Sequence, residues 1–246
     1  MTRNLQADVR GAVARHLETD LSLGLRETPL HSPRPVIRKL QILTADKVAQ
    51  RQTALAAINE RVGQCTRCGL AKTRTKTVPG QGNPAARLVF VGEAPGRDED
   101  QQGLAFVGRA GQLLTKMIEA MGLTRDEVYI CNILKCRPPE NRDPAPDEIS
   151  NCWPYLDEQL RIIQPEVIVA LGKPASQTLL RTKEGIGRLR GVWQEYYTSG
   201  SSAVGEPTPL MPTFHPAYLL RSPTEKGKAW SDLKQVMTRL GLPITR

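Results

Sequence analysis

Four of the five cysteines in this 246-residue chain are spaced like metal ligands. Cys65 and Cys68 form a C-x2-C pair, and Cys136 and Cys152 follow further along the chain. Such thiolates suit either a tetrahedral zinc ion or an iron–sulfur cluster, and spacing alone does not separate the two. The alternative is that Cys136 and Cys152 are ordinary buried cysteines. Cys131 lies within an apolar run and is expected to be a core residue.

The segment GEAPGRDEDQQGLAFVG, residues 92–108, is a second place where chemistry is expected. It holds four glycines, four acids and one aromatic, Phe106, and it directly follows the apolar run LVFV. The whole chain has a formal charge of +9, so the acids in this loop need a reason. Glycines let a backbone approach a ligand closely, whereas the bland alternative is a solvated surface turn.

His215, in the segment FHPAYLLRSP, is the histidine best placed for chemistry. The other two histidines, His16 and His31, lie in an N-terminal stretch that contains no other chemical motif. If the domain uses an imidazole, it must therefore be that of His215.

Composition limits the class of protein. A hydrophobic share of 39% supports a sizeable core, and a sequence pI of about 9.5 indicates a polyanionic partner. No apolar run approaches the roughly 20 residues of a membrane helix. The N-terminus also lacks an apolar signal-peptide core, so we expect a cytoplasmic protein with no membrane partner. Disulfides are not expected in that compartment, which favours metal or cluster ligation.

The elements that must position these residues alternate between apolar runs and amphipathic stretches. Proline content and weak periodicity predict a flexible extension over 1–45, followed by one domain over 46–246. Near-continuous apolar strands separated by helices predict a parallel sheet covered on both faces, with ligands at the carboxyl ends of the strands. The expected strands are 88–92, 128–134, 167–172 and 209–215, and the expected helices are 45–62, 110–123, 147–163, 173–181 and 224–240.

Three loops, together with the cysteine spacing, carry a family resemblance. The loops GEAPGRDEDQQGLAFVGRAG, NILKCRPPENRDP and FHPAYLLRSP each accompany an expected strand, and in this order they closely resemble the family 4 uracil-DNA glycosylases. The resemblance runs from about Cys65 to the C-terminus. It implies an α/β fold, a three-layer αβα sandwich around a four-stranded parallel sheet. It also implies an enzyme that flips uracil out of DNA and hydrolyses its N-glycosidic bond, leaving an abasic site.

The resemblance implies a role for each motif residue. Glu93 and His215 match catalytic positions. Phe106 matches the aromatic that stacks on the extruded uracil, and Asn132 matches the asparagine that hydrogen-bonds the pyrimidine edge. The further residues that match the first motif or the uracil pocket are Gly92, Ala94, Pro95, Gly96 and Glu99.

The four spaced cysteines match the ligands of the family's [4Fe–4S] cluster, so the resemblance moves the choice from zinc to iron–sulfur. We expect a structural cluster that joins the 65–68 segment to the 136–152 loop. The remaining alternative is a non-catalytic iron–sulfur or zinc protein of the same fold that only binds DNA.

Two positions depart from related glycosylases. Ala94 stands where some relatives have an aspartate that orients water, which leaves the water-activating group open. Ala105 stands where the family usually has a proline before the stacking aromatic, and this is expected to loosen the turn without moving the ring.

Binding of uracil-containing DNA requires cations outside the acidic loop. The candidate phosphate contacts are Arg137, Arg142, Lys173, Arg188, Arg190 and Arg221. Leu219 and Leu220 are candidates for a wedge that fills the gap left by the flipped nucleotide, with helix packing as the alternative. We expect a monomer whose N-terminal extension tethers it to a replication or repair partner.

Overall fold

The structure is a computed structural model that describes residues 43–198 and 207–244. The expected extension over 1–45, and with it the expected tether, lies almost wholly outside the described residues. No helix in these two ranges combines the length and the hydrophobicity that crossing a membrane requires.

A mixed six-stranded sheet forms the centre of the fold, with the strand order β1-β3-β2-β4-β6-β5. The strands are β1 (Gln81–Gly82), β2 (Leu88–Gly92), β3 (Tyr129–Asn132), β4 (Val167–Leu171), β5 (Gln194–Tyr196) and β6 (Thr208–Thr213). The strands β3, β2, β4 and β6 are parallel, and β1 and β5 add antiparallel edges, so the sheet is mixed and has two strands more than the expected four-stranded parallel sheet. These edge strands are too short to show a period of two residues.

The two central strands β2 and β4 are buried along their whole length. Successive side chains point to opposite faces, so Val89 and Val91 enter one core and Leu88 and Phe90 enter the other. A strand that is apolar on both faces requires a helical layer on each side. The sequence pattern therefore sets the three layers.

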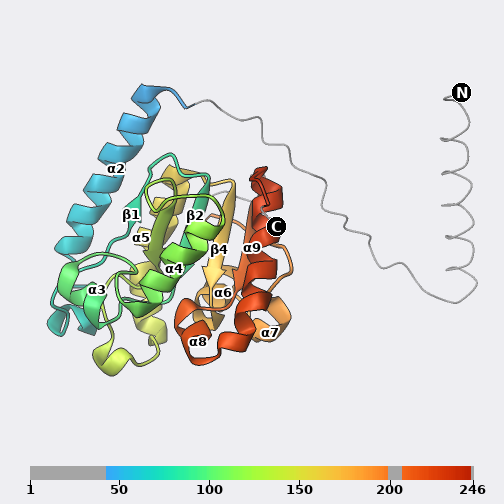
Figure 1. The fold of residues 1–246 in the computed structure, drawn as a ribbon. Coiled ribbons are helices and arrows are strands. Elements are labelled where there is room, and N and C mark those ends of the chain that lie inside the picture. Colours follow the sequence, from blue (N-terminus) through green and yellow to red (C-terminus); the bar gives the residue numbers. More distant parts are fainter. Residues whose placement is uncertain (1–42, 199–206, 245–246) are drawn as a thin grey trace, which may run out of the picture. The chain divides into compact units, whose positions relative to one another are not determined.

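Helices cover both faces of this sheet (Figure 1). Residues of α2, α5 and α6 share one core with the sheet, and residues of α4 and α9 share the other. The helices are α2 (Ala45–Gly63), α3 (Arg97–Gln102), α4 (Arg109–Ala120), α5 (Pro146–Ile163), α6 (Lys173–Leu180), α7 (Ile186–Leu189), α8 (Pro216–Arg221) and α9 (Lys226–Leu240), with short 3-10 turns at η1 (Gly69–Lys72), η2 (Pro139–Asn141) and η3 (Pro223–Glu225). The five long helices were expected within a few residues, whereas α3, α7 and α8 are too short for a helical period.

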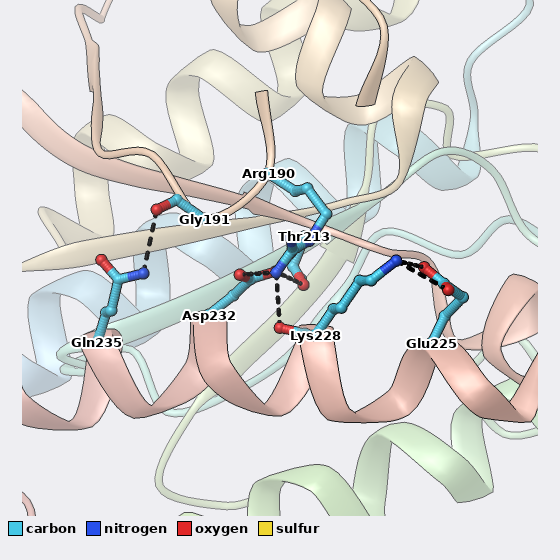
Figure 2. A network of polar contacts seen from close by, with 7 residues as sticks. All are labelled: Arg190, Gly191, Thr213, Glu225, Lys228, Asp232 and Gln235. Atoms are coloured by element: carbon cyan, nitrogen blue, oxygen red, sulfur yellow. Dashed lines mark hydrogen bonds and ion pairs between the residues drawn. The ribbon is translucent and has the colours of Figure 1, made fainter. Parts of the chain in front are cut away.

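A buried carboxylate ties the last helix to the sheet, as Figure 2 shows. Asp232 on α9 accepts hydrogen bonds from Thr213 Oγ1 at 2.7 Å and from Arg190 Nε at 3.1 Å, and its second oxygen pairs with the same guanidinium. Arg190 also donates to the Lys228 carbonyl at 2.7 Å. The side chains of Asp232 and Arg190 are only 1% and 19% exposed. A buried charge of this kind needs its partner, since breaking such a pair leaves an uncompensated charge.

We expect Arg190→Met to destabilise the fold by about 3 kcal/mol, because it leaves the Asp232 carboxylate buried with only one remaining donor. Urea unfolding measures the loss. The matched control is Arg188→Met, since Arg188 is 83% exposed and its ion pair among the described residues is with Glu184 on the surface, where such pairs contribute little. Equal stability of the Arg190 variant and the wild-type protein would contradict the structural role of this ion pair.

Candidate active site

A cavity of about 860 Å³ opens at the carboxyl ends of the parallel strands. Its walls come from the loop after β2, the loop after β3, the start of α6 and the segment after β6. The three loops that carry the sequence motifs therefore meet at one cavity. Parallel α/β sheets place ligands at this edge, so the location agrees with the strand pattern.

Three predicted pocket residues come together here: Asn132 and Phe106 line the cavity, and Gly92 packs against both. Gly92 and Asn132 end neighbouring strands and are paired in register. A Cβ atom on Gly92 would collide with Asn132 Oδ1 and with the Phe106 ring, so only glycine fits there. Asn132 is 1% exposed, and its Oδ1 has no hydrogen-bond partner within the described part of the chain. A buried acceptor without a partner is costly, which makes this oxygen a candidate ligand contact.

The Phe106 ring lies beside His215 in the cavity wall. The two ring centroids are 5.6 Å apart, and the ring planes are tilted by 35°. Phe106 has a φ of 54°, in the left-handed region that bulky residues rarely adopt. Backbone strain of this kind is characteristic of functional sites.

His215 is held in a defined tautomer. It precedes α8, and its Nδ1 accepts a hydrogen bond from the Ala217 backbone N–H at 3.1 Å. The proton of the neutral ring must therefore sit on Nε2. Burial, with a smaller contribution from the charge of Arg221, lowers the pKa of His215 to about 4. The imidazole is thus a neutral hydrogen-bond donor at pH 7.

Glu93 is an acid with an unusual pKa in the same cavity. Burial raises the pKa of Glu93 to about 7, and the nearby carboxylate of Asp143 adds to the effect. Ala94, Pro95 and Gly96 follow it along the cavity wall. Asp143 was not predicted as a site residue, although the loop KCRPPENRDP that contains it ends at a sheet edge where ligands are expected.

Two other acids of the glycine-rich loop, Glu99 and Asp100, are not free in solvent. Glu99 Oε1 accepts from the backbone N–H groups of Val107 and Gly108, both at 2.9 Å, and Oε2 accepts from Gly96 at 3.1 Å. Asp100 is buried and accepts from the Thr75 N–H with both oxygens. Glu99 lines the cavity as expected, but its oxygens bind backbone groups that shape the loop. The surface-turn interpretation is therefore wrong for these two acids.

The arginines and the lysine that are candidate phosphate contacts lie in different environments. Arg142 lines the cavity but pairs with Glu148 through two hydrogen bonds, and Arg137 Nε donates to Asn141. Lys173 and Arg221 line the cavity and make no ion pair with any described residue. The sequence did not single out Lys228, which also borders the cavity and pairs with Glu225.

Two of the predicted DNA contacts are wrong, because their side chains are buried. Arg190 is largely buried against Asp232 and holds the fold together, so it is not a free phosphate contact. Leu219 is 1% exposed and packs with Phe214 in a small core, so it cannot enter a duplex without leaving that core. Helix packing, the alternative for this leucine, is correct. Leu220, the next residue, is half-buried.

A second, smaller cavity brings together the four spaced cysteines. Cys65 and Cys68 lie between α2 and η1, Cys136 follows β3, and Cys152 lies in α5, yet all four line the same space. Cys131 is fully buried in β3 and belongs to the core. In the described ranges, no three His, Cys, Asp or Glu side chains close on a single metal ion.

Polar groups surround the cysteine cavity. Arg74 donates to the Cys136 sulfur at 3.3 Å and to the Cys65 carbonyl at 2.8 Å, and the Lys135 backbone N–H lies 3.2 Å from the Cys152 sulfur. Donors of this kind stabilise thiolates and are typical of the surroundings of bound metal centres.

Comparison with known proteins assigns the family. The model of the uracil DNA glycosylase superfamily matches residues 79–234. The type-4 uracil-DNA glycosylase of Archaeoglobus fulgidus is 44% identical over 187 residues, which cover 74% of this chain and 92% of that protein. The type-4 enzyme of Thermotoga maritima is 46% identical over 173 residues, covering 70% and 86%. A type-5 uracil-DNA glycosylase of Pyrobaculum aerophilum is 36% identical over 121 residues, covering 43% and 53%. The chain therefore belongs to the uracil-DNA glycosylase superfamily, with the type-4 enzymes among its relatives.

Proposed function

We propose that this protein is a DNA repair enzyme that hydrolyses the N-glycosidic bond of uracil in DNA and leaves an abasic site. The observation that carries the proposal is the convergence of Phe106, Asn132 and His215 on one cavity, with the Asn132 oxygen lacking a partner. A protein that only binds DNA would not need these three groups in one pocket. The non-catalytic alternative is therefore not favoured.

Base recognition depends on the Asn132 amide. Its Oδ1 accepts from the uracil N3–H, and its Nδ2 donates to the adjacent O4, so one amide matches both groups. Cytosine presents the reverse pattern and leaves Oδ1 unsatisfied. The Phe106 ring gives the flipped base an apolar face, and base–aromatic stacking contributes about 1–3 kcal/mol per base.

Bond breaking leaves a negative charge on the uracil and a positive charge on the sugar. The Nε2–H of neutral His215 donates to the uracil carbonyl where negative charge accumulates, and a donor fixed in advance needs no reorganisation. The Glu93 carboxylate holds the attacking water or stabilises the cationic sugar, which accounts for an acid in a loop that faces DNA. Ala94 takes no part in water activation, because it has no polar side chain.

Attraction for phosphates comes from the rim of the cavity. Lys173 and Arg221 are the candidates supported by position, since both face the cavity without a carboxylate partner among the described residues. Such contacts bind all sequences and weaken with salt.

Four thiols that line one cavity suit either an iron–sulfur cluster or a zinc ion. The resemblance to the family 4 enzymes favours the cluster. We propose that Cys65, Cys68, Cys136 and Cys152 hold a [4Fe–4S] cluster. When bound, the cluster links the segment after α2 to the β3 loop and to α5.

We expect Asn132→Asp to lower uracil release by at least about a hundred-fold, as loss of one preorganised donor does elsewhere. A carboxylate cannot donate to O4, and it repels the leaving anion. The measurement is single-turnover release of uracil from a uracil-containing oligonucleotide. Asn83→Asp is the matched control, because Asn83 lies outside the cavity and its Oδ1 accepts from Ala85 N–H, which an aspartate can also do. Wild-type rates in Asn132→Asp would refute the role of the amide.

We expect kcat/KM to rise with pH through about 7, where the buried Glu93 loses its proton. The active form is the carboxylate, so activity falls as pH drops below that value. His215 stays neutral across this range, since its pKa is about 4. Glu93→Gln should remove the inflection and lower the rate, and Asp143→Asn should move the inflection to lower pH because a repelling charge is lost. An unchanged profile in Glu93→Gln would assign the inflection to another group.

We expect purified protein to absorb near about 400 nm, as iron–sulfur proteins generally do, and to contain iron but no stoichiometric zinc. Cys152→Ser should lose both iron and colour, whereas Cys131→Ala should keep both, because Cys131 is a core residue outside the cysteine cavity. Metal analysis and the absorption spectrum provide the readout. A colourless wild-type protein with one zinc per chain would reverse the choice of metal.

A further inference from the structure

The backbone at Phe106 adopts a conformation that its own residue type disfavours. A bulky side chain at a φ of 54° persists only where the surrounding structure over-determines it. Phe106 and Ala105 are both buried, so the turn cannot exchange its hydrogen bonds with bulk water. The groups that hold this turn therefore set the place of the ring.

Both polar groups of the preceding residue are held by side chains from elsewhere in the fold. The Ala105 N–H donates to Gln81 Oε1 at 3.2 Å, and the Ala105 carbonyl accepts from Arg125 Nη2 at 2.8 Å. Gln81 belongs to the edge strand β1, and Arg125 lies ahead of β3. The other arm of Arg125 donates to Thr115 Oγ1 on α4 at 3.1 Å. Two of these contacts reach the turn itself, and the third anchors Arg125 to α4.

The far side of the turn is fixed as well. Glu99 Oε1 holds the N–H groups of Val107 and Gly108, and a Cβ atom on Gly111 would collide with the Phe106 carbonyl. The turn is therefore confined along its whole length. Of these contacts, those of Gln81 and Arg125 act on the residue directly before the ring.

Arg125 donates to neutral oxygens although it is a cation. Both of its described hydrogen bonds end on a carbonyl and a hydroxyl, and burial lowers its pKa. An arginine that served only to keep the surface soluble would not place its guanidinium against these buried oxygens. Its planar fork can hold two oxygens at fixed positions, which a lysine cannot do.

The presence of Ala105 is part of this arrangement. Gln81 can accept a hydrogen bond there only because residue 105 has an N–H, which a proline lacks. The expectation that Ala105 loosens the turn is therefore countered by a hydrogen bond that a proline at this position could not make.

We propose that Arg125 and Gln81 are positioning residues that hold the left-handed turn and thereby set the Phe106 ring for stacking on the base. The proposal rests on the proposed glycosylase function. Neither residue touches the cavity, so both act through the ring. Their loss should weaken contact with the base while leaving contact with the phosphate backbone unchanged.

The test uses Arg125→Met and Gln81→Met in the full-length protein, with Lys116→Met as control, since Lys116 is an exposed cation next to Thr115 on α4. The dissociation constant of free uracil should rise about ten-fold in Arg125→Met, within the range that stacking covers. Affinity for DNA with an abasic site should stay within about two-fold, because phosphate contacts dominate it. Arg125→Lys, which can hold one of the two oxygens, should recover part of the uracil affinity.

Two double-mutant cycles separate positioning from general stability. Arg125→Met should add nothing to Phe106→Leu, since a residue that acts through the ring has no effect once the ring is gone. Gln81→Met should likewise add nothing to Ala105→Pro, which already lacks the N–H. Additive effects on uracil affinity, or unchanged affinity in both single variants, would overturn the proposal. Melting curves show whether Arg125→Met folds. If it does not, the Gln81 double-mutant cycle alone tests the proposal.

Hydrogen exchange at the backbone amides of Val107 and Gly108 measures how firmly the turn is held, and it does not depend on catalysis. Faster exchange in Arg125→Met and Gln81→Met supports the restraint, and unchanged exchange in both contradicts it. Absence of uracil release by the wild-type protein would instead refute the proposed function, so the two failures are distinguishable.

Discussion

The site depends on the close approach of the Gly92 backbone to the Asn132 amide and the Phe106 ring. A methyl group at this position would collide with both, so the pocket floor exists only because β2 ends in a glycine. The register between β2 and β3 then places the amide beside this gap. The amide and the ring that we propose to read and stack on the base both lie against this glycine. The absence of a side chain at Gly92 leaves the space that these two groups occupy.

The contacts of the loop acids explain why a basic protein carries carboxylates in a loop beside its cavity. Glu99 and Asp100 have their charges taken up by backbone N–H groups, so they shape the loop without facing DNA as free charges. Only Glu93 remains in the cavity with a raised pKa, while burial pushes the pKa of His215 down. One environment thus gives an acid that titrates near neutrality and an imidazole that stays neutral. Titratable pairs displaced in this way are typical of catalytic sites.

The central strands, the long helices and the motif loops could be predicted because each leaves a periodic or compositional trace. The burial of Leu219 and Arg190 could not be predicted. In sequence, a leucine that packs in a core looks the same as one in an exposed amphipathic turn, and a paired arginine looks the same as a free one. The edge strand β1 was missed because two residues carry no period, although Gln81 within it holds the turn at Phe106. The cysteine spacing predicted that these four thiols belong together, and they line one cavity. It did not predict the arginine and lysine groups that surround them.

Lys135 connects the cysteine cavity to the end of β3 that carries Asn132. Its backbone N–H donates to the Cys152 sulfur, and its buried ammonium donates to the Asn132 carbonyl at 2.9 Å and to Gln159 Oε1 at 2.7 Å. A buried ammonium without a carboxylate among these partners needs negative charge nearby, and the thiolates that would ligate the proposed cluster would supply it. A structural cluster would therefore do more than join chain segments. It would also stabilise the cation that holds the backbone of Asn132, and with it the amide that we propose recognises the base.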